Sequence, residues 1–133
     1  NNNDIKRIVK KEILKYKNKL FYDNDISNND NYNKLCDWNR KIDDITGYSI
    51  LISYLENEGI IDGILNDILK IVFDDMNDNN SNLYKLIICV YNIINISKDL
   101  DEVYINKLKE LKKKKIESKI RFKIMDIEDI LNI

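Results

Sequence analysis

Residues 118–130 read SKIRFKIMDIEDI, and on a helix this stretch divides into two faces. At about 100° per residue, the isoleucines fall in one stripe, which is typical of the buried side of a packed helix. With its flanking residues, that stripe contains Ile116, Ile120, Ile124, Ile127 and Leu131. The roughly opposite side carries Arg121, Phe122, Met125 and Asp129. A Phe and a Met among charged residues indicate a second contact surface. That surface either meets a partner or is more core, with the helix lying between two neighbours.

Apolar residues recur at helical spacing through most of the chain. The sequence has no proline and only three glycines, so the turn residues that a many-stranded sheet needs are scarce, and we predict an all-α fold. A first helix is expected over residues 4–22, followed by a loop rich in Asn and Asp over residues 23–33. A long second helix has its apolar positions from residue 35 to residue 55. Gly59 stands where a C-terminal cap would end it, and Gly47 within it indicates close packing of a neighbouring helix.

The middle of the chain predicts two further helices. The third has its apolar stripe over residues 61–72. The polar connector 74–80 follows and ends at Ser81, a candidate N-cap. The fourth helix has its apolar positions from residue 83 to residue 94. Its core, residues 86–96, is rich enough in β-branched side chains that a strand is the alternative.

The last third of the chain predicts a fifth and a sixth helix. Residues 98–101 form a turn, after which the fifth helix begins near Tyr104 and ends in the lysines 112–115, since cations are favourable at a helix C-terminus. Glu117 or Ser118 opens the sixth. Six helices with short connections can pair as three antiparallel hairpins of roughly 40 residues each, the period of a helical-repeat solenoid. A compact helical bundle is the alternative.

Composition indicates one soluble, globular domain. The 133 residues are 44% hydrophobic and 34% charged, with a net charge of −1, which argues against a strong global field for nucleic acid or anionic lipid. No apolar run approaches the roughly 18 residues of a membrane span and no signal peptide is present, so we expect a cytoplasmic protein without membrane contact. Cys36 and Cys89 are expected to be buried free thiols rather than a disulfide. Because the chain begins with Asn1, we expect a fragment of a longer protein.

The chain lacks the residues that most catalytic templates need. It has no histidine, so imidazole bases, Cys-His and Ser-His pairs and the usual mixed zinc sites are excluded. None of the glycines has the spacing of a phosphate-binding loop, and the aspartates of residues 74–78 lack the ligand order of an EF-hand. The carboxylate pairs 43–44 and 128–129 are expected to be solvated. We therefore predict neither an enzyme nor a cofactor or metal site; an enzyme that uses Cys36 or Cys89 as a lone nucleophile is a remote alternative.

A run of cations concentrates positive charge near one end of this nearly neutral chain. Such a patch can neutralise several phosphates without reading bases, so we predict an RNA contact there. The residues that we expect to make it are Lys112, Lys113, Lys114, Lys115 and Lys119. A solvated helix end is the alternative. No aromatic residue is interleaved with these lysines, so the sequence offers no platform there for base stacking.

Three motifs, in order and at matching separations, resemble the middle domain of eukaryotic translation initiation factor 4 gamma, the scaffold subunit of the cap-binding complex. The first is Gly47 followed by apolar residues at 52, 55, 60 and 61. The second is residues 98–101, Lys-Asp-Leu-Asp, which resemble the family's G-K-D-L-D turn with Ser97 in place of the glycine. The third is residues 118–129, which resemble the family's S-x-I-R-F-x-x-x-D-x-x-D helix.

The resemblance covers residues 4–133 and makes the chain, residues 1–133, the C-terminal portion of such a domain. It implies HEAT-type helical hairpins, no catalytic residues, and a scaffold that docks the DEAD-box RNA helicase eukaryotic initiation factor 4A and binds RNA. The resemblance carries over most directly to Arg121 and Phe122, which lie in the helix that contributes to helicase docking in the family. It implies that the helicase binds the surface that these two residues form with Met125 and Asp129. It also implies an apolar face on the first helix that another chain covers, which allows self-association.

Two features of the resemblance leave the partner open. The family continues beyond its last helix into an Arg-containing tail, whereas this chain ends at Ile133. Related middle domains also occur in poly(A)-binding-protein partners and in proteins of RNA decay, splicing and nuclear cap binding. The alternative function is therefore an adaptor in one of those processes, because fold transfers between relatives more safely than a partner does.

Overall fold

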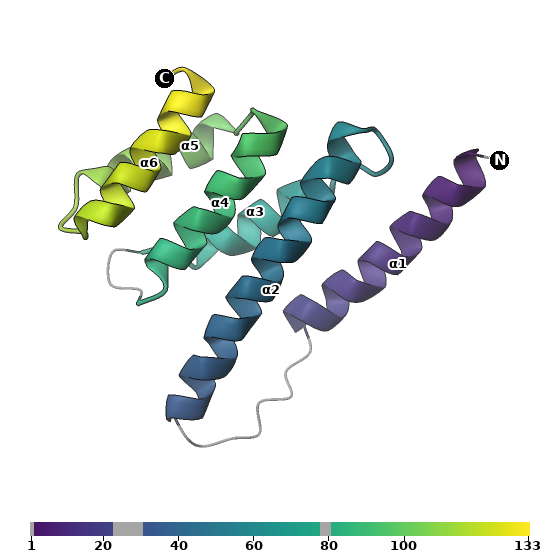
Figure 1. The fold of residues 1–133 in the computed structure, drawn as a ribbon, viewed down its shortest axis with the longest axis horizontal. Coiled ribbons are helices and arrows are strands. Elements are labelled where there is room, and N and C mark those ends of the chain that lie inside the picture. Colours follow the sequence, from purple (N-terminus) through teal and green to yellow (C-terminus); the bar gives the residue numbers. More distant parts are fainter. Residues whose placement is uncertain (1, 23–30, 78–80) are drawn as a thin grey trace.

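The computed structural model describes the backbone of residues 2–22, 31–77 and 81–133, and the side chains of residues 3–16, 40–77 and 81–133. Over these residues the chain forms six helices and no strand, which confirms the all-α prediction (Figure 1). The helices are α1 (Asn2–Tyr22), α2 (Asn31–Asn57), α3 (Ile64–Asp74), α4 (Leu83–Ser97), α5 (Glu102–Lys112) and α6 (Ser118–Leu131).

Helices α2, α4 and α6 lie side by side and run in the same direction (Figure 1). The most extensive packing is between α2 and α4 and between α4 and α6, so α4 is the centre of the fold. Helices α3 and α5 lie behind this row, and α1 runs beside α2 in the opposite direction (Figure 1). Each helix of the row thus follows a helix outside it, and the buried core lies between the row and helices α3 and α5.

The central position of α4 explains its ambiguous sequence. Most of its residues are apolar, and seven of its fifteen are buried. A helix that is apolar on most sides needs neighbours on most sides, and α2, α3 and α6 provide them. The predicted helix is therefore confirmed, and the alternative of a strand over residues 86–96 is wrong. The N-cap is Asn82 rather than the predicted Ser81.

Several helix boundaries follow the local signals in the sequence. Asp101 caps α5 by accepting a hydrogen bond from the Val103 amide at 3.0 Å. Glu117 precedes α6 as its N-cap residue. After α2, Gly59 has φ +73°, and its amide and that of Ile60 donate to the carbonyls of Glu56 and Leu55, the paired bonds of a Schellman C-cap.

Two predictions about α2 are wrong. The helix begins at Asn31, so residues 31–33 are helical and not part of a loop; the rest of that predicted loop, residues 23–30, lies outside the described residues. Gly47 is exposed, and a Cβ built on it meets no atom within 4 Å among the described residues. No helix of the described residues approaches it there. Close contact with α1 is made instead by Tyr48, whose hydroxyl donates a hydrogen bond to the Ile13 carbonyl at 2.8 Å. Burial raises the pKa of Tyr48 to about 12, and the nearby Tyr16 raises it further.

Three helix ends are closed by side chains from other helices. The N-cap of α3 is Gly63, which has no side chain to offer, and the Glu56 carboxylate of α2 accepts the Leu65 amide at 3.0 Å in its place. At the other end of α3, the Lys107 ammonium of α5 donates to the Phe73 carbonyl. Arg121 of α6 closes the end of α5. These contacts satisfy groups that a helix cannot satisfy by itself.

Glu56→Ala is expected to destabilise the domain by about 1 kcal/mol, the usual cost of losing an N-cap. Glu56→Gln should be near neutral at pH 7, because its amide oxygen still accepts the Leu65 hydrogen bond. Urea unfolding of both variants measures the difference. Equal destabilisation by Ala and Gln would contradict the capping role.

Acid provides a second test of Glu56. Burial raises the pKa of this carboxyl above its usual range, although hydrogen bonds from Leu65, Gly63 and Ile64 lower it. A raised folded-state pKa means that the folded protein takes up the proton more readily. The stability contributed by that proton is therefore lost as the pH rises through the folded-state pKa. Wild type should gain stability relative to Glu56→Gln when the pH is lowered through that range.

Candidate functional site

Helix α6 presents two different faces, as its sequence pattern predicts. Ile120, Ile124 and Ile127 are buried, and Ile116 and Leu131 pack against the core from its edge. On the other side, the Phe122 side chain is 62% exposed and that of Met125 is 45% exposed. Phe122 is therefore not part of the core that the described residues form, and the alternative that α6 is covered on both sides is wrong there.

The exposed residues Phe122, Met125 and Asp129 form one surface, which we call the α6 outer face. Residues three and four apart are neighbours on a helix, so Phe122 and Met125 are adjacent, and Asp129 continues the line. Asp126 is exposed beside them and forms an ion pair with Lys123 at 3.4 Å. An aromatic and a thioether flanked by carboxylates suit a partner surface with an apolar socket and a basic rim.

Arg121 is partly buried and makes contacts within the fold that the sequence did not predict. Its Nε donates to the Lys112 carbonyl at 3.2 Å and one terminal nitrogen donates to the Lys114 carbonyl at 2.9 Å. The cation therefore lies at the negative end of α5, where such a charge is favourable. The guanidinium thus ties the first turn of α6 to the C-terminal end of α5 and the turn after it.

The predicted RNA-contacting lysines separate into two groups. Lys113, Lys114 and Lys115 are exposed in the turn between α5 and α6, and Lys119 is exposed on the first turn of α6. Lys112 instead pairs with Glu128 across the hairpin, at 2.6 Å between Nζ and Oε1. The structure thus assigns Lys112 an internal contact.

The prediction that the Glu128 carboxylate is solvated is wrong. Its side chain is 11% exposed, and the Lys112 ammonium is the partner that accompanies it. The helical pattern places Glu128 next to Ile124 and Ile127 on the inward side, and the Lys112 ammonium of α5 compensates the burial of its charge. Asp129, its neighbour, is exposed as predicted, as are Asp43 and Asp44.

Two tyrosines of α4 lie against α6 beneath its lysines. The Lys119 ammonium is 4.5 Å from the centre of the Tyr84 ring, and the Lys123 ammonium is 4.2 Å from that of Tyr91. These are cation–π distances. Sequence reasoning missed both rings because Tyr84 is 35 residues from Lys119. The seven-residue spacing of the tyrosines shows that they share a helix face, but it does not identify the helix that covers them.

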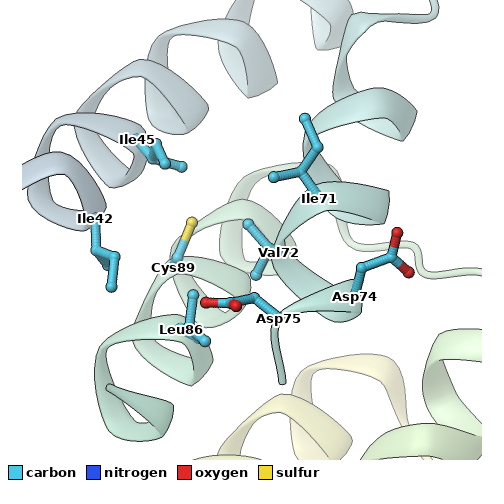
Figure 2. Close-up of a pocket in the computed structure, with 8 residues that line it drawn as sticks. All are labelled: Ile42, Ile45, Ile71, Val72, Asp74, Asp75, Leu86 and Cys89. Carbon is cyan, nitrogen blue, oxygen red and sulfur yellow. The ribbon is translucent and has the colours of Figure 1, made fainter. Parts of the chain in front are cut away.

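A pocket of about 300 Å³ opens between α2, α3 and α4 (Figure 2). Apolar side chains form most of its wall, and two carboxylates from the end of α3 lie at its edge. The lining residues are Ile42, Ile45, Ile71, Val72, Asp74, Asp75, Leu86 and Cys89. No sequence motif predicted it, since its walls come from three separate helices. Within the described residues, no three His, Cys, Asp or Glu side chains are placed to hold a metal ion.

Cys89 is a free, fully buried thiol in the wall of this pocket, as predicted for it; the Cys36 side chain lies outside the described residues. Burial raises the pKa of Cys89, although its contact with Ser49, 3.6 Å between Sγ and Oγ, acts in the opposite direction. Both the shielding and the raised pKa lower the supply of reactive thiolate at neutral pH.

We expect iodoacetamide to alkylate Cys89 at least about a hundredfold more slowly in the folded protein than in 8 M urea, because reaction requires opening of the core. Peptide mapping by mass spectrometry separates Cys89 from Cys36. Fast labelling of Cys89 in the folded state would contradict its burial.

Among residues 2–22, 31–77 and 81–133, none of the helices combines the length and the apolar character needed to cross a membrane. Comparison of the chain with models of protein families, with curated proteins and with solved structures found no match.

Proposed function

We propose that this chain is a scaffold domain of translation initiation that docks a DEAD-box RNA helicase, eukaryotic initiation factor 4A, and contacts RNA in the cytoplasm without an enzymatic activity of its own. The observation that carries the proposal is the exposure of Phe122 on a helix whose opposite side is core. The family resemblance of the same segment supports the identity of the partner.

Exposed aromatics of this kind are typical anchors of protein interfaces. A Phe side chain left in water forgoes about 2 kcal/mol that burial would contribute. On α6 it lies beside a second flexible apolar side chain, Met125, and is bordered by the exposed carboxylates of Asp126 and Asp129. Interface hot spots have this composition, an apolar centre within a polar rim. The helicase would supply the socket and the cations.

In the proposed site, Arg121 positions the docking helix. Its two hydrogen bonds to the carbonyls at the end of α5 set the direction of α6, and the Lys112–Glu128 pair adds a second tie between the same helices. A rigid presentation lowers the ordering cost of binding. The direct helicase contact that the resemblance implies for Arg121 stays a prediction beside this role.

The proposed architecture is a stack of HEAT-type hairpins. It is supported by the alternation between the row α2, α4 and α6 and the helices outside it, and by the antiparallel course of α1 beside α2 (Figure 1). Self-association is proposed for α1, where Ile5 and Ile8 are each 59% exposed. A scaffold of this kind acts by binding one helicase conformation better than another, which shifts the population of that conformation.

A panel of purified DEAD-box helicases tests the proposed partner. Isothermal titration should give the tightest binding with the initiation helicase and weak or no binding with helicases of RNA decay and splicing. Preference for a decay or splicing helicase would favour the alternative, an adaptor in one of those processes. Binding of none would overturn the docking proposal.

A further inference from the structure

The packing of α4 against α6 places two tyrosine rings of α4 beside the lysines of α6. Along the sequence these rings lie far from the lysines. Lys119 lies over Tyr84 and Lys123 over Tyr91, with ammonium-to-ring distances of 4.5 and 4.2 Å. Both rings are half-buried, so each keeps part of its surface accessible. We call these four residues the Tyr–Lys seam.

The Tyr–Lys seam continues the lysine-rich turn. Because α4 and α6 run in the same direction, the first turn of α6 lies beside the first turn of α4, and the exposed lysines 113–115 lie just before it (Figure 1). Tyr84 and Tyr91 are seven residues apart, about 10 Å along the helix axis. Cations and rings therefore follow one line from the turn along the contact between the two helices.

We propose that the Tyr–Lys seam binds single-stranded RNA, with bases stacked on Tyr84 and Tyr91 and phosphates held by the lysines that now cover the rings. A base takes the ring face, and the displaced ammonium reaches the phosphate beside that base. The inference rests on the proposed RNA contact and assigns to it a site and a class of ligand. Aromatic platforms combined with a basic groove are the usual design of proteins that bind single strands with little sequence preference.

The carboxylates near the seam do not prevent this exchange. Glu117 pairs with Lys119 at 3.8 Å, and Asp126 pairs with Lys123 at 3.4 Å. Both carboxylates are more than half exposed, and ion pairs at such sites contribute little. A phosphate offers each lysine at least as good a partner. A duplex, by contrast, keeps its base faces stacked and cannot use the tyrosines.

Fluorescence anisotropy with a labelled 12-nucleotide oligouridine and a 12-base-pair RNA duplex tests the proposal. Tyr84→Leu with Tyr91→Leu removes the ring faces but keeps apolar packing against the core. This variant should lose at least about tenfold in affinity for the single strand, with an unchanged salt dependence. Tyr54→Leu is the matched control, since Tyr54 is 57% exposed on α2, and it should bind within twofold of wild type. Thermal melting verifies that each variant is folded.

Lys113→Gln with Lys115→Gln separates the charge contribution from the stacking contribution. This variant should weaken binding and lower the slope of log affinity against log salt by about 1.4 for the two charges removed. If it weakens binding while the tyrosine variant binds like wild type, the seam is not a stacking site, although the RNA contact stands. Equal affinity for the duplex would also overturn the seam. If wild type binds neither RNA, both the seam and the proposed RNA contact fail, independently of the helicase result.

Discussion

Phe122→Ala is expected to lower the affinity for the helicase about 30-fold or more while the melting temperature stays within about 1 °C of wild type. The loss corresponds to about 2 kcal/mol, the threshold for an interface hot spot. Stability is preserved because the ring is 62% exposed and its removal opens no cavity in the core. Titration calorimetry with the purified helicase and thermal melting measure the two quantities.

The control for Phe122→Ala is Tyr54→Ala, which removes an aromatic side chain of comparable exposure from α2, at a distance from the α6 outer face. It should leave helicase binding within twofold of wild type. Met125→Ala should fall between the two, since Met125 belongs to the same surface but is more covered than Phe122. Two results would contradict the docking site: unfolding by Phe122→Ala, or equal losses from Phe122→Ala and Tyr54→Ala.

Lys112→Met is expected to destabilise the fold by about 2 to 3 kcal/mol, one of the largest losses available to a single polar substitution here. It leaves the Glu128 carboxylate almost fully buried without its cation, and a buried charge without a partner is costly. The value lies below that of a fully buried pair because the lysine side chain is 32% exposed. Urea unfolding monitored by circular dichroism measures the change.

The double variant Lys112→Met with Glu128→Leu should recover most of that loss, since two apolar groups can replace a buried pair at little cost. Lys85→Met is the matched control. Lys85 pairs with Asp43 at 3.1 Å in an exposed position, where the loss should stay below about 1 kcal/mol. Similar losses from Lys112→Met and Lys85→Met would show that burial gives the Glu128 pair no special importance.

The features that could be predicted from the sequence are those set by neighbours within about one helical turn. The stripe of isoleucines in α6, the cap at Gly59 and the break between helices at residues 98–101 depend on spacing and backbone chemistry that a short segment contains. Even the exposure of Phe122 follows from its angle to that stripe. Where local signals compete, the boundary moves by a residue, as from Ser81 to Asn82 at the start of α4.

The remaining features depend on which helices become neighbours, and periodicity does not contain that information. Glu128 looks solvated until α5 brings Lys112 to it, across 16 residues. Tyr84 and Lys119 meet across 35 residues because α4 and α6 lie in one row. Gly47 looked like a contact site, but no helix approaches it among the described residues. The helicase and RNA assignments remain predictions.

The closure of helix ends by other helices has a mechanical consequence. The Glu56 carboxylate accepts a hydrogen bond at the N-terminus of α3, and the Lys107 ammonium donates one at its C-terminus. The Arg121 guanidinium donates a hydrogen bond at the C-terminus of α5. Displacement of α6 would remove the Arg121 hydrogen bond from the carbonyl at the end of α5. Displacement of α5 would likewise remove the Lys107 hydrogen bond from the Phe73 carbonyl of α3. We predict that load applied at the α6 outer face is passed through these contacts from α6 to α5 and from α5 to α3, so that the three helices resist pulling together.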